Sequence, residues 1–117
     1  MINGTTGADC ILGLGGQDTI NGLGGDDVIS GGDGDDIITG GDGDDVIFCG
    51  AGQDHADGGN GNDALYGGDG DDRLTGSAGN DVLYGEQGQD TLTGSAGTDR
   101  CVGGPGSNTF FTCEVMQ

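Results

Sequence analysis

The sequence predicts an all-β solenoid, because one nine-residue unit repeats along almost the whole chain. Aspartate recurs at every ninth position from Asp9 to Asp99, a glycine stands two residues before each of these aspartates, and an apolar residue stands two residues after each. No stretch shows the i, i+3, i+4, i+7 apolar spacing of an amphipathic helix. A period of nine instead fits a tight turn followed by a short strand, which we expect to be about three residues long.

The three fixed positions have different physical roles. Glycine allows a backbone with positive φ or a close approach of a neighbouring chain segment. The aspartate provides an anionic oxygen at constant spacing. One apolar residue per unit is too little to bury alone, so the units must stack and share a core. The predicted core column comprises Ile11, Ile20, Ile29, Ile38, Ile47, Ala56, Leu65, Leu74, Leu83, Leu92, Cys101 and Phe110.

The best-formed units carry a family resemblance. Residues 31–39 (GGDGDDIIT) and 40–48 (GGDGDDVIF) resemble the calcium-binding nonapeptide of the repeats-in-toxin (RTX, hemolysin-type) family. The likeness extends over residues 4–111, and twelve tandem copies make it specific. It implies a right-handed parallel β-roll (a β-solenoid) with two nonapeptides per coil, about six coils and a C-terminal cap. Residues 1–111 would then form the calcium-binding roll, and residues 112–117 the cap or tail.

The resemblance also implies where calcium binds. In this family the ions lie between successive loops at the edges of the roll, held by aspartate carboxylates and backbone carbonyl oxygens. Six loops on each edge would leave five gaps, so the chain would bind at most about ten ions. The implied ligands are Asp9, Asp18, Asp27, Asp36, Asp45, Asp54, Asp63, Asp72, Asp81, Asp90 and Asp99, together with Gly22, Gly24, Gly31, Asp33, Gly40, Asp42, Gly58, Asn60, Gly67, Asp69 and Gly76.

The loops match the family pattern unevenly. Residues 31–36, 40–45, 58–63 and 67–72 fit best, and we expect calcium mainly in these central loops. The departures elsewhere are Thr5 and Thr6 in the first loop, Cys49 at a first glycine, Leu14, Leu23, Ser77, Glu86 and Ser95 at second glycines, and the uncharged Asn108 in the last loop. Atypical end units are expected of a solenoid.

Composition indicates what calcium would do for the chain. It has 21 acidic residues against two Lys and Arg, a formal net charge of −19, and 31 glycines. Charge repulsion opposes compaction, and glycine raises the backbone entropy that folding must overcome. We therefore expect the chain to be unfolded at cytosolic calcium and to fold where calcium reaches extracellular concentrations.

Other interpretations of the aspartates fit less well. An acidic disordered linker has a similar composition, but disorder does not require an apolar residue at every ninth position. An EF-hand needs a sixth-position glycine and a twelfth-position glutamate, which never occur together here. Magnesium avoids all-protein cages, and zinc would need clusters of Cys and His, whereas His55 is the one histidine.

Catalysis finds no support in the sequence, and we expect no enzyme activity. His55 has no serine or cysteine nucleophile placed for it. The chain contains no lysine, which excludes a phosphate-binding loop, and its net charge disfavours nucleic acid binding. No apolar run approaches the ~18 residues of a membrane span.

The outward strand positions differ between the two faces of the predicted roll. One face is mostly apolar and aromatic, with Val28, Val46, Phe48, Tyr66, Val82 and Tyr84. These residues either reflect strand propensity or form a surface for self-association or for docking of another protein. The other face is rich in threonine, as in an ice-binding solenoid, but His55, Asp57 and Arg73 interrupt its rows.

Four cysteines in so short a chain indicate an oxidising compartment. Cys101 and Cys113 are close in sequence, and a Gly-Gly-Pro-Gly segment between them permits a tight return. We expect a disulfide there, which would lock a C-terminal cap made from Phe110, Phe111 and Val115. Cys10 and Cys49 would lie too far apart along the roll for a bridge, so they should be free or pair between molecules.

Two classes of function fit these observations. The first is a calcium-binding structural protein, secreted or attached to the cell surface, that folds on extracellular calcium. The second is the C-terminal calcium-folding and secretion module of a larger secreted enzyme, toxin or adhesin. Both place the chain outside a bacterial-type cell, with calcium ions as the ligand.

Overall fold

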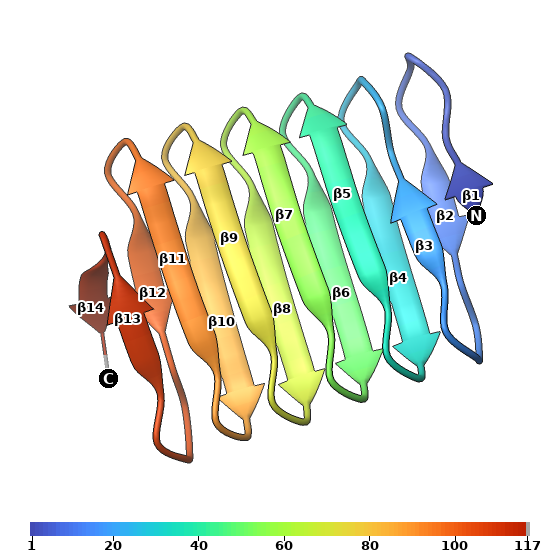
Figure 1. The fold of residues 1–117 in the computed structure, drawn as a ribbon. Helices are drawn as coiled ribbons and strands as arrows, with labels where there is room; N and C mark the ends of the chain where they lie inside the picture. Colours follow the sequence, from blue (N-terminus) through green and yellow to red (C-terminus); the bar gives the residue numbers. More distant parts are fainter. Residues whose placement is uncertain (117) are drawn as a thin grey trace.

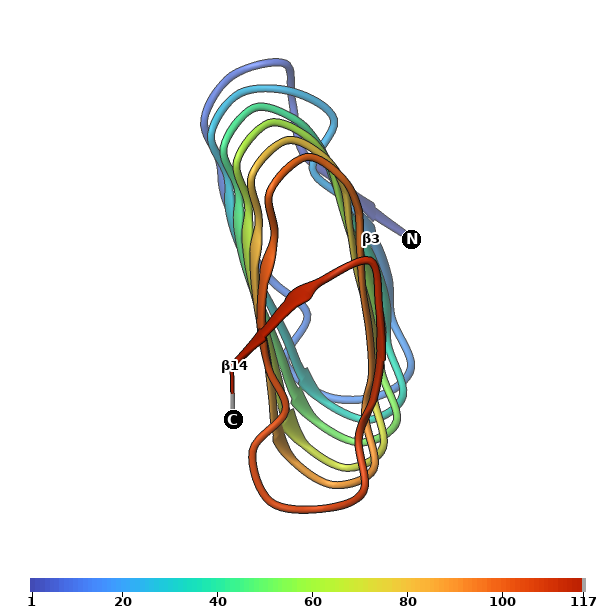
Figure 2. The same cartoon turned by 90° about the vertical axis from the view of Figure 1, so that its left-hand side faces the viewer.

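The computed structural model describes residues 1–116, and the side chains of residues 1–114. Strands alternate between two stacked sheets, so that each coil of the chain contributes one strand to each sheet (Figure 1). The coils superpose when viewed along the solenoid axis (Figure 2), and the molecule is flat, with extents of 34 × 30 × 14 Å. The described residues contain no helix. This is the all-β parallel solenoid that the sequence predicts.

Each sheet has seven strands, and neighbouring strands are parallel. The odd sheet consists of β1 (Ile2–Asn3), β3 (Thr19–Asn21), β5 (Ile37–Asp42), β7 (His55–Asn60), β9 (Arg73–Ala78), β11 (Thr91–Ala96) and β13 (Thr109–Phe111). The even sheet consists of β2 (Cys10–Leu12), β4 (Val28–Asp33), β6 (Val46–Ala51), β8 (Ala64–Asp69), β10 (Val82–Gln87), β12 (Arg100–Val102) and β14 (Glu114–Met116). Partners such as Ile29 and Ile47 are 18 residues apart, which confirms two nonapeptides per coil.

Strand length is the point where the sequence-based expectation was wrong. Strands β4 to β11 each have six residues, and only the strands nearer the ends are as short as expected. The additional residues are the first three of the next unit, where Gly32 pairs with Gly50 and Asp33 with Ala51. The pairing is the same where serine replaces the second glycine, since Ser77 pairs with Ser95, so the parallel ladder continues past the apolar residue into the turn.

The core is a single column of side chains between the two sheets. Every residue of the predicted column except Phe110 is buried, and Phe110 packs partly buried against the last coil. Cys49 joins this column although it stands at a first-glycine position, and its side chain is fully buried. The position of a residue within the nine-residue unit therefore determines whether its side chain is buried, because the apolar residue of every unit points toward the core.

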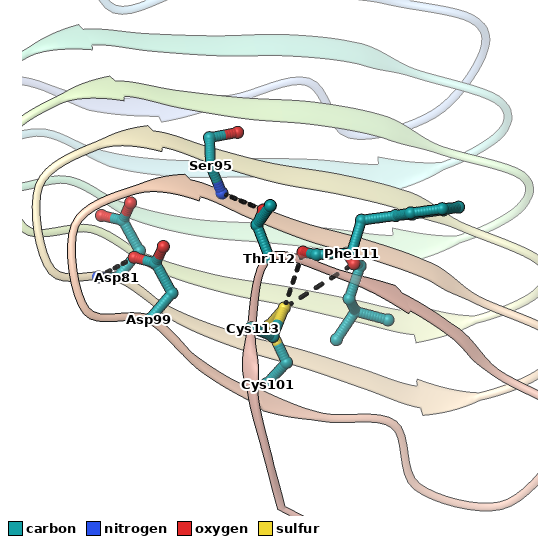
Figure 3. Close-up of a disulfide and its surroundings, with 8 residues drawn as sticks. Asp81, Ser95, Asp99, Cys101, Phe111, Thr112 and Cys113 are labelled. Atoms are coloured by element: carbon teal, nitrogen blue, oxygen red, sulfur yellow. Dashed lines mark hydrogen bonds between the residues drawn. A yellow bond between two sulfur atoms is a disulfide. The ribbon is translucent and has the colours of Figure 1, made fainter.

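The C-terminal coil is shorter than the others and carries a disulfide (Figure 3). Cys101 bonds to Cys113 across a Cα–Cα distance of 5.8 Å, as predicted, and Cys10 and Cys49 are free, as expected. Strand β14 pairs with β12 at an offset of 14 residues (Arg100 with Glu114), four fewer than elsewhere.

The predicted cap made from Phe110, Phe111 and Val115 is not found as such. Phe110 packs against the core, but 53% of Phe111 is exposed, so Phe111 takes no part in a packed cap. The Val115 side chain lies outside the described residues. The division at residues 111 and 112 stays a prediction, because β14 continues the even sheet beyond it.

Candidate metal centre along the two loop edges

The turns of the solenoid form two long edges. We call the aspartates at every ninth position, from Asp9 to Asp99, the ladder aspartates. Those on the first edge are Asp9, Asp27, Asp45, Asp63, Asp81 and Asp99. Those on the second edge are Asp18, Asp36, Asp54, Asp72 and Asp90, and Asn108 continues this row.

One oxygen of each carboxylate from Asp27 onward, Oδ1, is fixed by the backbone of the preceding coil. The N–H of Asp27, for example, donates to Asp45 Oδ1 at 2.8 Å, and the N–H of Asp54 donates to Asp72 Oδ1 at 2.8 Å. The same bond recurs along both edges at 2.8–2.9 Å and ends at Asp99 and Asn108. The ladder aspartates are thereby held inside the edges, and nine of them are 1–3% exposed.

The second oxygen of these carboxylates has no partner. Oδ2 of all ten ladder aspartates from Asp18 to Asp99 is buried without any hydrogen bond, five atoms on each edge. A buried carboxylate oxygen without a donor is costly unless a cation or a proton compensates it. The regular spacing of these atoms makes the two edges rows of equivalent, electron-rich positions.

The first glycine of each loop leaves space beside this oxygen. A Cβ built on Gly31 would lie 2.6 Å from Asp36 Oδ2 and 2.7 Å from the carbonyl oxygen of Cys49 in the next coil. A Cβ on Gly67 would meet Asp72 Oδ2 at 2.6 Å and the Gly85 carbonyl oxygen at 2.7 Å. Carboxylate and carbonyl oxygens therefore face a common space with no donor between them. Calcium, which takes six to eight oxygen ligands at about 2.3–2.6 Å, fits this donor set.

The first and last loops differ from the central loops in the hydrogen bonding at the Oδ2 position. In the first loop, Asp9 Oδ2 accepts the N–H of Thr5 at 2.6 Å and the hydroxyl of Thr5 at 2.9 Å. In the last loop, Asn108 Nδ2 donates to the Gly104 carbonyl oxygen at 3.1 Å. Sequence comparison between units marks both loops as departures, and the structure shows that a hydroxyl or an amide there supplies the donor that the central loops lack.

The central carboxylates have a strongly raised proton affinity. Burial raises the pKa of Asp45 and Asp54 to about 6 and that of Asp63 and Asp72 to about 7. The ladder hydrogen bond lowers these pKa values and the neighbouring carboxylates raise them, but burial is the largest effect. In the absence of metal these groups therefore bind protons near neutral pH.

The other residues implied as ligands divide into two sets. The first-position glycines line the space beside Oδ2, and they are Gly22, Gly31, Gly40, Gly58, Gly67 and Gly76. The third-position residues lie farther out on the edges, and they are Gly24, Asp33, Asp42, Asn60 and Asp69. All except Gly24 are exposed, and Asn60 Nδ2 donates to Asp42 Oδ1 at 2.9 Å.

Substitution of the second glycine leaves the shape of the turn unchanged. Leu14, Leu23, Ser77, Glu86 and Ser95 all adopt positive φ, between 71° and 82°. Residues other than glycine rarely adopt positive φ. These five loops therefore carry a local conformational strain in the backbone, whereas the loops with glycine at this position do not. The second-glycine substitutions that distinguish these loops in the sequence therefore do not change the sign of φ at this position.

A further ladder on the outside of the edges escaped the sequence analysis. The fifth-position residues Asp26, Asp44, Asn62 and Asn80 each accept, through Oδ1, the N–H of the residue 18 positions later at 2.8–2.9 Å. This direction is opposite to that of the ladder aspartates. On the second edge Asp35 and Asp71 make the same bond, whereas Gln53, which stands between them, does not. The recurrence of Asp or Asn at the fifth position was the available signal.

Side chains alone do not form a metal cluster. Within residues 1–116, no three His, Cys, Asp or Glu side chains converge on one point, so carbonyl oxygens must complete any ion's shell. In the same part of the chain, no helix is long and apolar enough to cross a membrane.

Comparison with known families agrees with the site. The sequence model of the RTX calcium-binding nonapeptide repeat, which describes four copies of the unit, matches residues 1–29, 21–56, 50–83, 57–92 and 75–110. No curated protein matches the chain significantly. The family match spans nearly all of the solenoid, and each matched range contains ladder aspartates with an unpartnered Oδ2. The chain therefore belongs to the RTX calcium-binding nonapeptide repeat family, whose repeats bind calcium.

Proposed function

We propose that the chain is a structural module that folds when calcium fills the gaps between its coils. The observation that carries this proposal is the set of ten buried Oδ2 atoms without a donor, five on each edge. The ladder aspartates would supply carboxylate oxygens, and the first-position and third-position residues would supply further oxygens. Each ion would neutralise carboxylates that otherwise repel one another across adjacent coils.

The net charge of the chain supports about the same number of ions as there are unpartnered Oδ2 atoms, which is ten. Ten divalent ions carry a charge of +20, close in magnitude to the formal charge of −19. Self-repulsion at that charge opposes the compact state, so neutralisation and folding are coupled. The β-roll is accordingly a calcium-binding fold rather than a catalytic one, and we propose no enzymatic activity for it.

A count of bound ions tests the proposal. Isothermal titration of the metal-stripped chain with calcium, followed in parallel by far-ultraviolet circular dichroism, should show up to about ten ions bound as β-structure appears. Magnesium at the same concentration is the control and should not replace calcium. Absence of binding at millimolar calcium would contradict the proposal.

We place the module outside the cell. Extracellular calcium modules bind with dissociation constants of about 10⁻⁴–10⁻³ M, which cytosolic calcium does not reach. The Cys101–Cys113 disulfide supports the same location, because such bonds persist in oxidising compartments. Detection of the oxidised protein in the medium or on the surface of the bacterial-type cell that produces it would test this placement.

A role as the C-terminal module of a larger secreted enzyme, toxin or adhesin is the second candidate. Strands β1 and β2 lie at the ends of their sheets, so their outer backbone groups pair with no strand among the described residues. A preceding segment could continue both sheets at this end. The reading frame upstream of Met1 decides between the two roles, since a catalytic or adhesive domain there would establish the second.

A further inference from the structure

Three asparagines of the chain are followed by glycine, a setting in which asparagine is prone to lose its amide. The pairs are Asn3–Gly4, Asn21–Gly22 and Asn60–Gly61, whereas Asn62, Asn80 and Asn108 precede Asp63, Asp81 and Thr109. Asparagine is one of the heat-labile residues. The backbone nitrogen of the following residue attacks the side-chain amide carbon, and a glycine, which has no Cβ, hinders this ring closure least. The three Asn–Gly pairs are therefore the reactive ones, and Asn60 lies in a central loop.

The reaction at Asn60 needs no enzyme and only water as co-reactant. The Gly61 N–H gives up its proton to solvent, and its nitrogen forms a bond to Asn60 Cγ while the bond from Cγ to Nδ2 breaks and ammonia leaves. Water then opens the cyclic imide at either of its carbonyl carbons. The product at position 60 is aspartate or isoaspartate, and in isoaspartate the main chain runs through the side-chain carbons and is longer by one atom.

In the folded solenoid, both polar atoms of the Asn60–Gly61 peptide group are hydrogen-bonded. The Gly61 N–H donates to the carbonyl oxygen of Ala78 in the next coil at 2.9 Å, and the N–H of Gly43 in the preceding coil donates to the Asn60 carbonyl oxygen at 2.9 Å. The side-chain amide is also held, since Asn60 Nδ2 donates to Asp42 Oδ1 at 2.9 Å. The Asn60 side chain is exposed, so it is these bonds, rather than burial, that keep the nitrogen from attacking.

The isoaspartate product does not fit this loop. Asn60 is the last residue of β7 and pairs with Asp42 in one neighbouring coil and Ala78 in the other. A longer main chain at this point moves Gly61 out of register. Gly61 has no space toward the preceding coil, because a Cβ built on it would collide with the carbonyl oxygen of Gly43. The folded loop therefore neither permits the reaction nor accommodates its longer product.

We propose that Asn60–Gly61 is a self-modification site, closed while calcium holds the coils together and open when the chain unfolds. Loss of calcium is then recorded as a covalent change that blocks refolding of this coil. The inference rests on the proposed function, since calcium is what stabilises the bonds between coils.

The other two pairs provide a graded comparison. The Gly22 N–H donates to the Thr39 carbonyl oxygen at 2.8 Å, and the Gly4 N–H donates to the Asn21 carbonyl oxygen at 2.8 Å. Asn3, however, lies in β1, the end strand of its sheet, where local opening costs least. In the folded chain, deamidation should therefore be fastest at Asn3 and slowest in the central loop, whereas in the unfolded chain the three rates should be similar.

Peptide mapping by mass spectrometry of the full chain, incubated in mildly alkaline buffer, measures the rate at each asparagine. In chelator, the three Asn–Gly pairs should deamidate at similar rates and well ahead of the other three asparagines. Calcium should slow the reaction at Asn60 by more than about tenfold, because the reaction must then wait for the coils to open. The effect at Asn3 should be smaller. Circular dichroism is recorded on the same samples.

The two measurements separate this inference from the proposed function. Equal rates at Asn60 with and without calcium, in a chain that gains β-structure with calcium, overturn the inference and leave the calcium module intact. A spectrum that does not respond to calcium overturns the proposed function itself.

A pair of variants tests the effect of the product on refolding. Asn3→Gln combined with Asn21→Gln leaves Asn60 as the one Asn–Gly pair, and further addition of Asn60→Gln gives the matched control, because glutamine must close a larger ring. Both variants are incubated in chelator and returned to calcium. The first variant should lose recovery of β-structure in proportion to its isoaspartate content at position 60, and the control should recover more. Equal recovery of the two variants overturns the block on refolding.

Discussion

The terminal loops and the central loops place the same atom in opposite situations. At the ends, Thr5 donates to Asp9 Oδ2, and Asn108 offers an amide donor where other loops have a carboxylate oxygen. In the ten loops between them, the equivalent oxygen is buried and has no donor. The comparison shows that the departures from the repeat at the two ends supply, from the chain itself, a hydrogen-bond donor that the central loops lack.

Removal of calcium should have the largest effect on the stability of the folded chain, because the central loops lack a donor and the terminal loops do not. If each site adds about 1.4 kcal/mol at tenfold ligand excess, ten sites supply on the order of 10 kcal/mol, which is the stability of a whole domain. Chelation at pH 8 should therefore abolish the β-signal in circular dichroism and expand the chain in small-angle scattering. An unchanged spectrum would mean that the central loops need an ion no more than the terminal loops do.

Acid should restore part of the order in the absence of calcium. The pKa values of the central aspartates rise from 3.8 to about 6 or 7 on folding, so the folded state binds protons more tightly than the unfolded state. Their contribution to stability is fully present below pH 4 and is lost as the pH rises through 6–7.

The measurement is circular dichroism of the metal-free chain between pH 4 and pH 8, with sedimentation to exclude aggregation. More β-structure at pH 8 than at pH 4 would reverse the expected sign. In that case, unpartnered central carboxylates would not be what opposes the folded state.

Two substitutions, Asp63→Asn in a central loop and Asp9→Asn in the first loop, test the difference between central and terminal loops at single residues. Asp63→Asn removes a central ligand and should lower the stability of the calcium-loaded chain by about 1–3 kcal/mol, with loss of at least one ion from the titration. In chelator at neutral pH, the same change should leave residual structure unchanged or increased, because an amide can donate to a loop carbonyl as in Asn108.

Asp9→Asn is the matched control in the first loop. Because Thr5 already satisfies Asp9 Oδ2, this change should leave the ion count unaltered and shift stability by less than about 0.5 kcal/mol. Equal losses of calcium from the two variants would show that the terminal loop binds an ion after all.

Thr5→Ala should have the smallest effect among the changes that are expected to lower stability, since Asp9→Asn is a control. It removes the hydroxyl bond to Asp9 and keeps the backbone N–H, so it should cost about 1 kcal/mol, with or without calcium. Thermal unfolding in calcium measures this loss, and in chelator at pH 4 the same loss should appear. A loss seen only with calcium would place an ion at the first loop.

The parts of the structure that follow from periodicity could be predicted from the sequence. A constant spacing of nine keeps one apolar residue per unit inside, and this fixes the 18-residue register, the two edges and the fold class. The disulfide followed from the proximity of Cys101 and Cys113. Periodicity does not show where a strand ends, and the central strands extend over the first three residues of the next unit to a length of six residues.

The chemistry of the edges needed coordinates. Thr5 and Asn108 stand out in the sequence as departures, but their donor role depends on loop dihedrals that place each group against one oxygen. The opposite directions of the two aspartate ladders are equally invisible to spacing, since both residues recur with the same period. Burial of Cys49 at a glycine position likewise results from backbone direction, not from its hydrophobicity.

The constant register has a consequence for the speed and order of assembly. Residues bonded across coils are 18 positions apart, a relative contact order of about 0.15, near that of mixed α/β domains rather than β-sandwiches. No long loop has to close before the next coil can form, and each coil touches only its nearest neighbours. The solenoid can therefore grow like a zipper from any coil that has already formed, with each added turn closing the same short loop.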